Sequence, residues 1–325
     1  MKPVTTTIDG LHLEMRPGHI ERILRDTQDK NLLDALTNMS PTDLQSLLLE
    51  VSRLRGENLT PASVLARSRE DRFARHSKVD PRKIIELDRI AFDVAVSRGF
   101  TPIELSPVTP LGTVSAIAKV SQNNIVSTNR NSEVVSDSTN VMALECAVRR
   151  KKEDVVRLCA SHRLLRAQPF SGPASFAHFR VFSMCTAGKN SSNRDFERDA
   201  LVGHIGVYLQ TLDDLKKTGY THGNLKVGLT DFSEQLGDVL ESVKSELRGQ
   251  FPNVEIEAQP DRIQAKGYYY PFCFWIFVGG EDGVEQNIGD GGFTDWTQQL
   301  LSNKKERLLI SGLGSERMCF LYGEQ

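Results

Sequence analysis

The sequence is poor in the features that mark several common protein classes. It has five cysteines, scattered and without a C-x-x-C pair, so we expect reduced, buried thiols and neither a disulfide framework nor a metal site. The longest apolar run, residues 268–278, is too short to span a bilayer, and residues 1–10 lack the apolar segment of a signal peptide. We therefore expect a soluble, cytoplasmic protein that does not associate with membranes.

The sequence also lacks a basic excess and a glycine-rich phosphate loop. Its formal net charge is -2, so contact with nucleic acid would need a local basic patch. Neither G-x-G-x-x-G nor G-x-x-x-x-G-K-[ST] occurs, which argues against a Rossmann or P-loop core. A nucleotide site without such a loop must hold phosphates by side chains, and the fixed fork of arginine suits this best.

The chain changes character near residue 100. Residues 18–95 show helical periodicity, and one helix is expected to begin with Ser40 as N-cap and Pro41 at the first helical position. Beyond residue 100, strand-like runs alternate with helices. We expect an N-terminal helical region over residues 1–84 and a larger domain over residues 85–325.

The larger domain is expected to be of the α+β class. Residues 157–168 and 178–188 read as two antiparallel strands joined by a loop over residues 169–177. Helices are expected between the later strands, and a glycine-rich turn is expected at Gly291 and Gly292. Hairpin strands with intervening helices predict an antiparallel sheet flanked by helices.

Three degenerate motifs in this domain resemble those of class II aminoacyl-tRNA synthetases. The first is a helix and a strand ending in proline, which "RGFTPIELSPV" matches. The second is an arginine, a loop, and a basic residue four places before a phenylalanine, here Arg166, His178 and Phe182. The third is "GLGSERM", which ends in Arg317. The resemblance covers about residues 85–320 and implies the class II fold.

Within this class, the likeness is strongest to the histidyl-tRNA synthetase core and to its paralogues that lack the anticodon-binding domain. "YYYPFCFWIFVGG" is similar to the family's double-tyrosine strand and includes Tyr269. "GDGGFTDWTQQLL" resembles its glycine-glycine-x-x-aspartate helix entry, with Gly291 and Gly292. "VVSDSTNVMALECA" resembles the segment that meets the substrate's amino group, here through Asp137 and Thr139.

The resemblance implies an ATP site with Mg²⁺ on the departing pyrophosphate. Arg166 would hold the α-phosphate and the acyl carboxylate, while Phe182 and Arg317 would sandwich the adenine. His178 would also contact the nucleotide. The first motif implies a homodimer, with residues 106–120 near the two-fold axis. An amino-acid-like small molecule is the expected substrate.

Departures from the family's sequence pattern limit which substrates are expected. Met184 and Gly188 stand where the family places the glutamine and glutamate that bind histidine, so histidine is not the expected ligand. Gln168 replaces the carboxylate that follows the second-motif arginine. The family's catalytic arginine is matched most nearly by Lys266, with Ala265 as the other register. Lysine keeps the charge but loses the bidentate fork.

Each of these residues also has a purely structural interpretation. Arg317 could form a helix-end ion pair, Phe182 could belong to the core, and Asp137 could act as an N-cap. The remaining candidates have equally simple alternatives: Arg166 as an exposed strand residue, His178 as a polar rim residue, Lys266 as a surface lysine, and residues 268–277 as core, with Tyr269 the best exception.

Two functions follow. The first is ATP-dependent activation of a carboxylate, with Arg166, Arg317 and Lys266 as catalytic groups and a tRNA, a carrier protein or an amine as acceptor. The second is a non-catalytic role like that of the ATP phosphoribosyltransferase regulatory subunit, with a phosphoribosyltransferase as partner. The retained arginines favour the first hypothesis. The chain ends seven residues after "GSERM", with no anticodon-binding domain, which favours the second.

Overall fold

The computed structural model describes residues 18–169, 176–191, 193–234, 236–280 and 284–323. The chain divides into two compact units that do not follow chain order. The first comprises the described parts of residues 1–76, 107–136 and 165–178, and the second comprises residues 77–106, 137–164 and 179–325. Most of the loop expected over residues 169–177 lies outside the described residues.

The first unit begins with a series of helices that bury none of their residues. These are α1 (His19–Asp26), α2 (Leu32–Asn38), α3 (Pro41–Glu57) and α4 (Pro61–Glu70). The expected start of α3 is confirmed, because the Ser40 side chain accepts a hydrogen bond from the Asp43 backbone N–H and Pro41 opens the helix. Helix α6 (Thr113–Ile117), the short 3-10 helix η1 (Gln122–Asn124) and the antiparallel pair β2 (Val108–Pro110) and β3 (Ser132–Val134) complete this unit.

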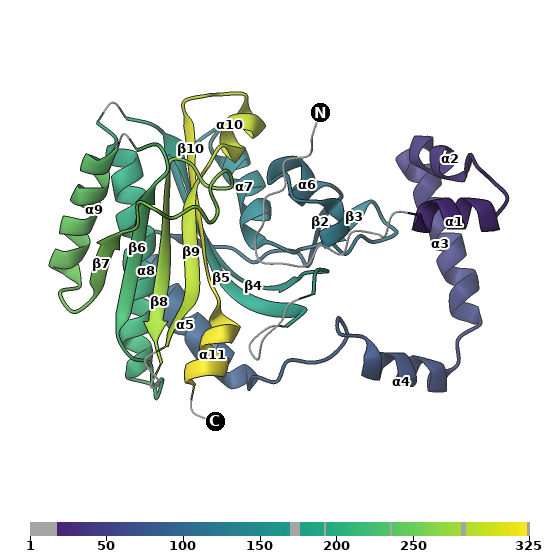
Figure 1. The fold of residues 1–325 in the computed structure, drawn as a ribbon, viewed down its shortest axis with the longest axis horizontal. Coiled ribbons are helices and arrows are strands. Elements are labelled where there is room, and N and C mark those ends of the chain that lie inside the picture. Colours follow the sequence, from purple (N-terminus) through teal and green to yellow (C-terminus); the bar gives the residue numbers. More distant parts are fainter. Residues whose placement is uncertain (1–17, 170–175, 192, 235, 281–283, 324–325) are drawn as a thin grey trace. The chain divides into compact units, whose positions relative to one another are not determined.

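The second unit is built on one eight-stranded sheet with the order β1-β4-β5-β10-β9-β8-β6-β7 (Figure 1). Its strands are β1 (Thr101–Pro102), β4 (Val155–Leu165), β5 (His178–Lys189), β6 (Leu225–Asp231), β7 (Glu255–Ala258), β8 (Phe272–Gly279), β9 (Glu285–Thr294) and β10 (Glu306–Leu313). The described inner pairs are antiparallel, whereas the outer pairs β1–β4 and β6–β7 are parallel. The expected antiparallel core is therefore present, within a mixed sheet.

Helices cover one face of this sheet. Helix α5 (Pro81–Ser97), α8 (Asp195–Lys216) and α9 (Gly237–Gln250) supply apolar side chains to the main core, together with residues of the strands. Phe274 and Ile276 of β8 and Val227 of β6 belong to this core. We call this side of the sheet the covered face.

Side chains alternate along a strand, so the residues directly before and after these core residues point to the opposite face of the sheet. Ser183, Trp275, Asp290 and Gly292 lie on it, and we call it the open face. Helix α7 (Ser138–Arg149) and α10 (Trp296–Leu301) pack together at one part of it, and α11 (Ser315–Tyr322) follows β10. No helix within the described residues is long and apolar enough to cross a membrane.

Candidate functional site

Four side chains gather on the open face around the pairing of β8 with β9. Trp275 and Asp290 are directly opposite each other in the strand register. The Arg262 guanidinium stacks on the Trp275 ring, with Cζ 3.5 Å from the ring centroid. The Tyr269 hydroxyl donates to Asp290 Oδ2 at 2.7 Å. We call these four residues the Arg262 cluster; it places a cation, a carboxylate and a phenol side by side on a rigid sheet.

Arg262 is positioned but not neutralised. One of its terminal nitrogens donates to Gln259 Oε1, and Gln259 itself fits because Gly228 has no side chain: a Cβ there would come 2.4 Å from the Gln259 amide oxygen. The buried Nε of Arg262 has no hydrogen-bond partner within the described residues. Burial lowers the pKa of Arg262, and the nearby Cys273 and Asp290 offset part of this. A half-buried guanidinium with an unused donor suits a planar anion.

Tyr269 is held against the sheet by a glycine. A Cβ on Gly292 would come 2.4 Å from Tyr269 Cγ and 2.8 Å from the Phe272 carbonyl oxygen. Tyr269 is therefore buried, and this burial, together with the carboxylate of Asp290, raises its pKa well above its ordinary value. At neutral pH it is a hydrogen-bond donor that fixes Asp290 as an acceptor.

Asp137 and Thr139 lie at the start of α7. The Asp137 Oδ1 accepts from the Thr139 backbone N–H at 2.9 Å and from its hydroxyl at 2.7 Å, so Asp137 caps the helix as the structural interpretation held. Ser138 contacts Ser183 of β5 through a 2.6 Å hydrogen bond between the hydroxyls. Because Ser183 lies on the open face, the start of α7, where Asp137 is the N-cap, meets the sheet on that face.

The adjacent Glu316 and Arg317 of α11 have different environments, one buried and one exposed. Glu316 is fully buried and accepts from the Arg180 backbone N–H at 2.8 Å, and Arg163 pairs with it at 2.9 Å. Ser77 also donates to it. Arg317, the next residue, is exposed and donates to Gln286 of β9 at 3.3 Å. Glu316 therefore anchors the helix, and Arg317 keeps its guanidinium at the surface.

Two predicted nucleotide contacts lie in the first unit. Arg166 Nε donates to the Ser136 carbonyl oxygen at 3.0 Å, and its backbone N–H donates to Ala177. His178 bonds the Arg75 carbonyl through Nε2. The buried Oε1 of Gln168 has no hydrogen-bond partner within the described part of the chain. The predicted roles of Arg166 and His178 stay predictions, because these residues and Arg317 belong to different units.

The structure corrects the interpretation of Phe182 and Met184. Both are fully buried on the covered face, and Phe182 packs edge-on against Phe92 of α5 with ring centroids 5.1 Å apart. Neither side chain offers a surface to a nucleotide or an amino acid on the open face. Packing explains why a glycine stands at position 188, since a Cβ there would come 2.4 Å from the Phe196 ring. The apparent loss of a histidine-binding pair thus reflects which residues of β5 face the core.

One further expectation is wrong in its local structure. Gly291 and Gly292 form no turn but lie inside β9, paired with β8 and β10. A Cβ on Gly291 would come 2.5 Å from Ser311 Cβ and 2.6 Å from the Phe274 ring, so the covered face requires a glycine there. The role of Lys266 stays a prediction: Lys266 is exposed, and the half-buried cation near the tyrosines is Arg262, four residues earlier.

The cysteines are buried and free, as the sequence predicts. Burial raises the pKa of Cys159 to about 12 and that of Cys319 to about 11, so these thiols stay protonated at neutral pH. No group of three or more His, Cys, Asp or Glu side chains within the described residues is arranged to hold a metal ion.

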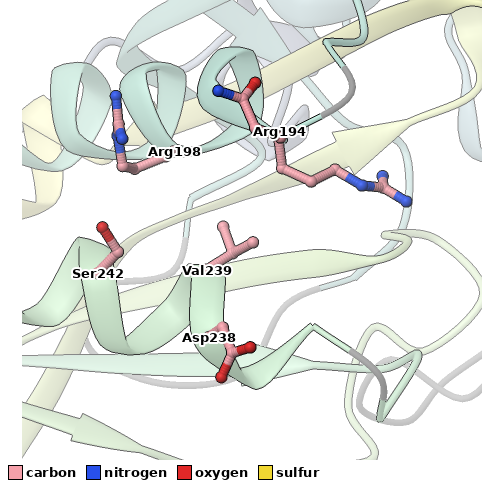
Figure 2. A pocket seen from close by; sticks show the side chains of 6 residues that line it. Arg194, Arg198, Asp238, Val239 and Ser242 are labelled. Atoms are coloured by element: carbon pink, nitrogen blue, oxygen red, sulfur yellow. The ribbon is translucent and has the colours of Figure 1, made fainter.

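A separate hollow of about 140 Å³ lies between the first turns of α8 and α9 (Figure 2). The labelled residues that line it are Arg194 and Arg198 at the start of α8, and Asp238, Val239 and Ser242 of α9. Arg194 pairs with Glu197 at 3.1 Å, and Arg198 pairs with Asp199 at 2.8 Å. Because both cations are already neutralised, we assign no ligand to this hollow.

Comparisons with solved structures identify the fold. The chain is similar to an ATP phosphoribosyltransferase regulatory subunit/histidyl-tRNA synthetase from Bacillus halodurans, at 12% identity and a TM-score of 0.55, over 78% of this chain and 82% of that one. It is also similar to histidyl-tRNA synthetase from S. aureus, at 12% identity and a TM-score of 0.57, over 75% of this chain and 68% of that one. Histidyl-tRNA synthetase from Nostoc sp. matches at 14% identity and a TM-score of 0.57, over 76% of this chain and 73% of that one.

These matches confirm the predicted class II synthetase-like fold. No protein-family model and no curated protein matches the sequence. The fold is thus shared with both ligases and a protein described as a regulatory subunit.

Sequence reasoning missed Arg262 and Asp290 as parts of the site. Asp290 stands in "GDGGFT", where the motif likeness involves the two glycines that follow it. Arg262 stands six residues before the first of three tyrosines, outside the expected register. The available signal was the strand period, because residues two apart share a face: Asp290 shares a face with Gly292, and Trp275 shares one with Cys273, the residue opposite Gly292 in the strand register.

Proposed function

We propose that the protein activates a carboxylate, of an amino acid other than histidine, by transferring an adenylyl group from ATP. The observation that carries this proposal is the Arg262 guanidinium, seated on Trp275 beside Asp290 with its Nε unused. In the proposed complex, Arg262 binds an anionic group and Asp290, fixed by Tyr269, accepts from the substrate's ammonium group.

The reaction is an in-line transfer. A carboxylate oxygen of the substrate attacks the α-phosphorus of ATP, the new phosphorus–oxygen bond forms, and the bond to the oxygen bridging to the β-phosphorus breaks as pyrophosphate leaves. Arg262 and Arg317 would stabilise the negative charge that develops on the phosphoryl oxygens. Arg166 is proposed for the α-phosphate, as the family resemblance implies.

Donors for ATP are thus present, but the described residues hold no cluster suited to a metal. Mg²⁺, when bound to ATP, would supply positive charge that neutralises the departing pyrophosphate. We assign it no protein ligand. A homodimer through residues 99–107, and a tRNA or carrier-protein acceptor, are further parts of the proposal.

A second function has its own support. Because Phe182 faces the core, the ring expected to stack on adenine is missing. One similar structure is described as an ATP phosphoribosyltransferase regulatory subunit. In this alternative the open face binds an amino-acid-like effector, and the protein acts by binding a phosphoribosyltransferase.

ATP–pyrophosphate exchange against a panel of amino acids separates the two functions. We expect exchange with at least one amino acid, reduced about a hundredfold by Arg317→Ala, as for the loss of one charge-stabilising donor. Arg89→Ala, which removes an exposed arginine of α5 paired with Asp93, is the matched control and should retain exchange. Amino-acid binding without exchange, together with saturable binding to a phosphoribosyltransferase, would instead establish the regulatory function.

A further inference from the structure

A larger hollow, of about 280 Å³, lies on the side of the second unit away from the Arg262 cluster. It opens between the end of α5, the first turns of α8 and the last turns of α9. Its lining combines two cations, Arg98 and Arg157, two carboxylates, Asp199 and Glu246, and the uncharged side chains of Phe100, Thr186 and Gln250. None of these residues was a candidate from the sequence.

Arg98 lines this hollow, and its hydrogen-bond acceptor there is a neutral amide. Its guanidinium lies flat on α8 at Gly206, where a Cβ would come 2.5 Å from Nη1. Its two terminal nitrogens lie 3.3 and 3.4 Å from the neutral amide oxygen of Gln250, and its Cζ is 5.8 Å from the Phe251 ring centroid. Burial lowers the pKa of Arg98. No carboxylate within the described residues lies at ion-pair distance from it.

Arg157 brings a second cation to the same place. Its Nη1 lies 3.8 Å from the position of a Cβ on Gly99, directly after α5. Its charge also reaches His204, whose pKa falls to about 3 mainly through burial and secondarily through Arg157. Among the described residues, Arg157 has neither a hydrogen-bond partner nor an ion-pair partner.

The pairing of other arginines shows that these two are unusual. Arg150 forms a buried two-bond pair with Glu306 at 2.9 and 3.0 Å, and Arg180 pairs with Asp88 at 2.7 Å. The carbonyl end of α5 favours a cation, but a helix end carries only about half a negative charge. Of the two carboxylates in the lining, Asp199 is paired with Arg198 at 2.8 Å. The two guanidinium groups therefore face one carboxylate, Glu246, that has no ion-pair partner within the described residues.

We propose that this hollow binds a compact organic or inorganic anion with carboxylate or phosphoryl groups, held between Arg98 and Arg157. The fork of arginine matches both groups in shape and charge. A volume just below the range of about 300–1,000 Å³ typical of drug-sized ligands limits the occupant to a small molecule. Asp199 and Glu246, which also line the hollow, weaken the site for ligands of high negative charge.

Isothermal titration calorimetry on the full chain tests this proposal at constant ionic strength in chloride. The probes are inorganic phosphate, pyrophosphate, malonate and citrate, so that the phosphoryl and carboxylate arms are compared directly. We expect saturable binding of at least one probe, weakened about tenfold or more by Arg157→Gln and by Arg98→Gln through the loss of a charge-assisted bond. Arg89→Gln, also on α5, is the matched control and should bind like the wild type.

A variant that binds the probe more tightly distinguishes a true effect on the site from poor folding of the variant. Glu246→Gln removes a negative charge from the lining and should tighten binding of the same probe several-fold, which misfolding would not produce. Absence of saturable binding for all four probes, or equal affinity in the wild type and Arg157→Gln, overturns the proposal. Because neither arginine belongs to the Arg262 cluster, Arg157→Gln should retain ATP–pyrophosphate exchange, so this proposal and the proposed activation fail independently.

Discussion

The two faces of the central sheet are built on different principles. The covered face is apolar and closely packed, and Phe182, Met184 and Phe274 lie there without any exposed surface. The open face carries a cation on an indole and a phenol on a carboxylate. Residues that alternate along the same strands thus serve stability on one side and polar chemistry on the other. A motif aligned to such a strand must therefore be checked for which face each of its residues occupies.

The largest expected effect that sharpens this comparison comes from Phe182→Ala. Removal of a fully buried phenylalanine should lower the free energy of unfolding by about 3–5 kcal/mol. Denaturant titration measures this loss. Tyr270→Ala, which truncates a side chain that is 64% exposed, is the control and should change stability by less than about 0.5 kcal/mol. If the covered face alone explains Phe182, the folded fraction of Phe182→Ala binds amino acid and ATP like the wild type.

Lower pH should weaken the covered face through His204. Its ring nitrogens lie 2.8 Å from the Thr186 hydroxyl and 2.7 Å from the Ser311 hydroxyl, and burial lowers its pKa to about 3. At pH 7 the ring is neutral whether the chain is folded or unfolded. As pH falls below about 6.5 only the unfolded chain gains the proton, so stability decreases until about pH 3.

The expected loss from this histidine between pH 7 and pH 5 is about 2 kcal/mol. Comparison of urea unfolding at both pH values, for the wild type and His204→Gln, isolates it, because the variant lacks the titrating ring. A variant with the same pH dependence as the wild type would show that other groups cause the change.

Adjacent glycines on opposite faces offer a direct comparison. Gly291→Ala would place a methyl against Phe274 and Ser311 on the covered face, and Gly292→Ala would place one against Tyr269 on the open face. Each should cost about 1–3 kcal/mol through overpacking. Only Gly292→Ala should displace Tyr269 and weaken amino-acid binding by the folded protein. Equal binding defects in both variants, measured by calorimetry, would contradict the assignment of the site to one face.

The smallest expected effect on stability comes from Tyr269→Phe. This change removes the 2.7 Å hydrogen bond to Asp290 and should lower the free energy of unfolding by about 1 kcal/mol. The change should weaken ligand binding more than it weakens the fold, because Asp290 would lose the donor that orients it. Thr297→Val, which removes a buried hydroxyl without a hydrogen-bond partner in the described residues, serves as a control that should leave binding unchanged.

The fold could be predicted from the sequence because its signals are local and ordered. The cap at Ser40, the amphipathic helix α5 and the paired strands on either side of residues 170–175 were each readable from short stretches. The class II likeness rests on the order of several weak motifs, and the similar structures confirm it at the level of the fold.

The site was less predictable because it depends on which face each residue occupies. Phe182 has the right spacing for the second motif, but the packing of α5 turns it into the core. Gly291 and Gly292 read as a turn, although close packing against both faces of the sheet requires them. Arg262 precedes its strand and reaches Trp275 only through the path of the intervening chain. These contacts form between segments distant in sequence, where motif spacing carries little information.

The central claim is that the Arg262 cluster is the ligand site of the open face. The most direct measurement compares ATP–pyrophosphate exchange and amino-acid binding in the wild type, Arg262→Gln and the matched variant Arg248→Gln, whose arginine bonds a backbone carbonyl of β7. We predict that Arg262→Gln loses about a hundredfold in exchange and binds the amino acid more weakly, while Arg248→Gln behaves like the wild type. Undiminished exchange and binding in a folded Arg262→Gln protein would contradict the claim.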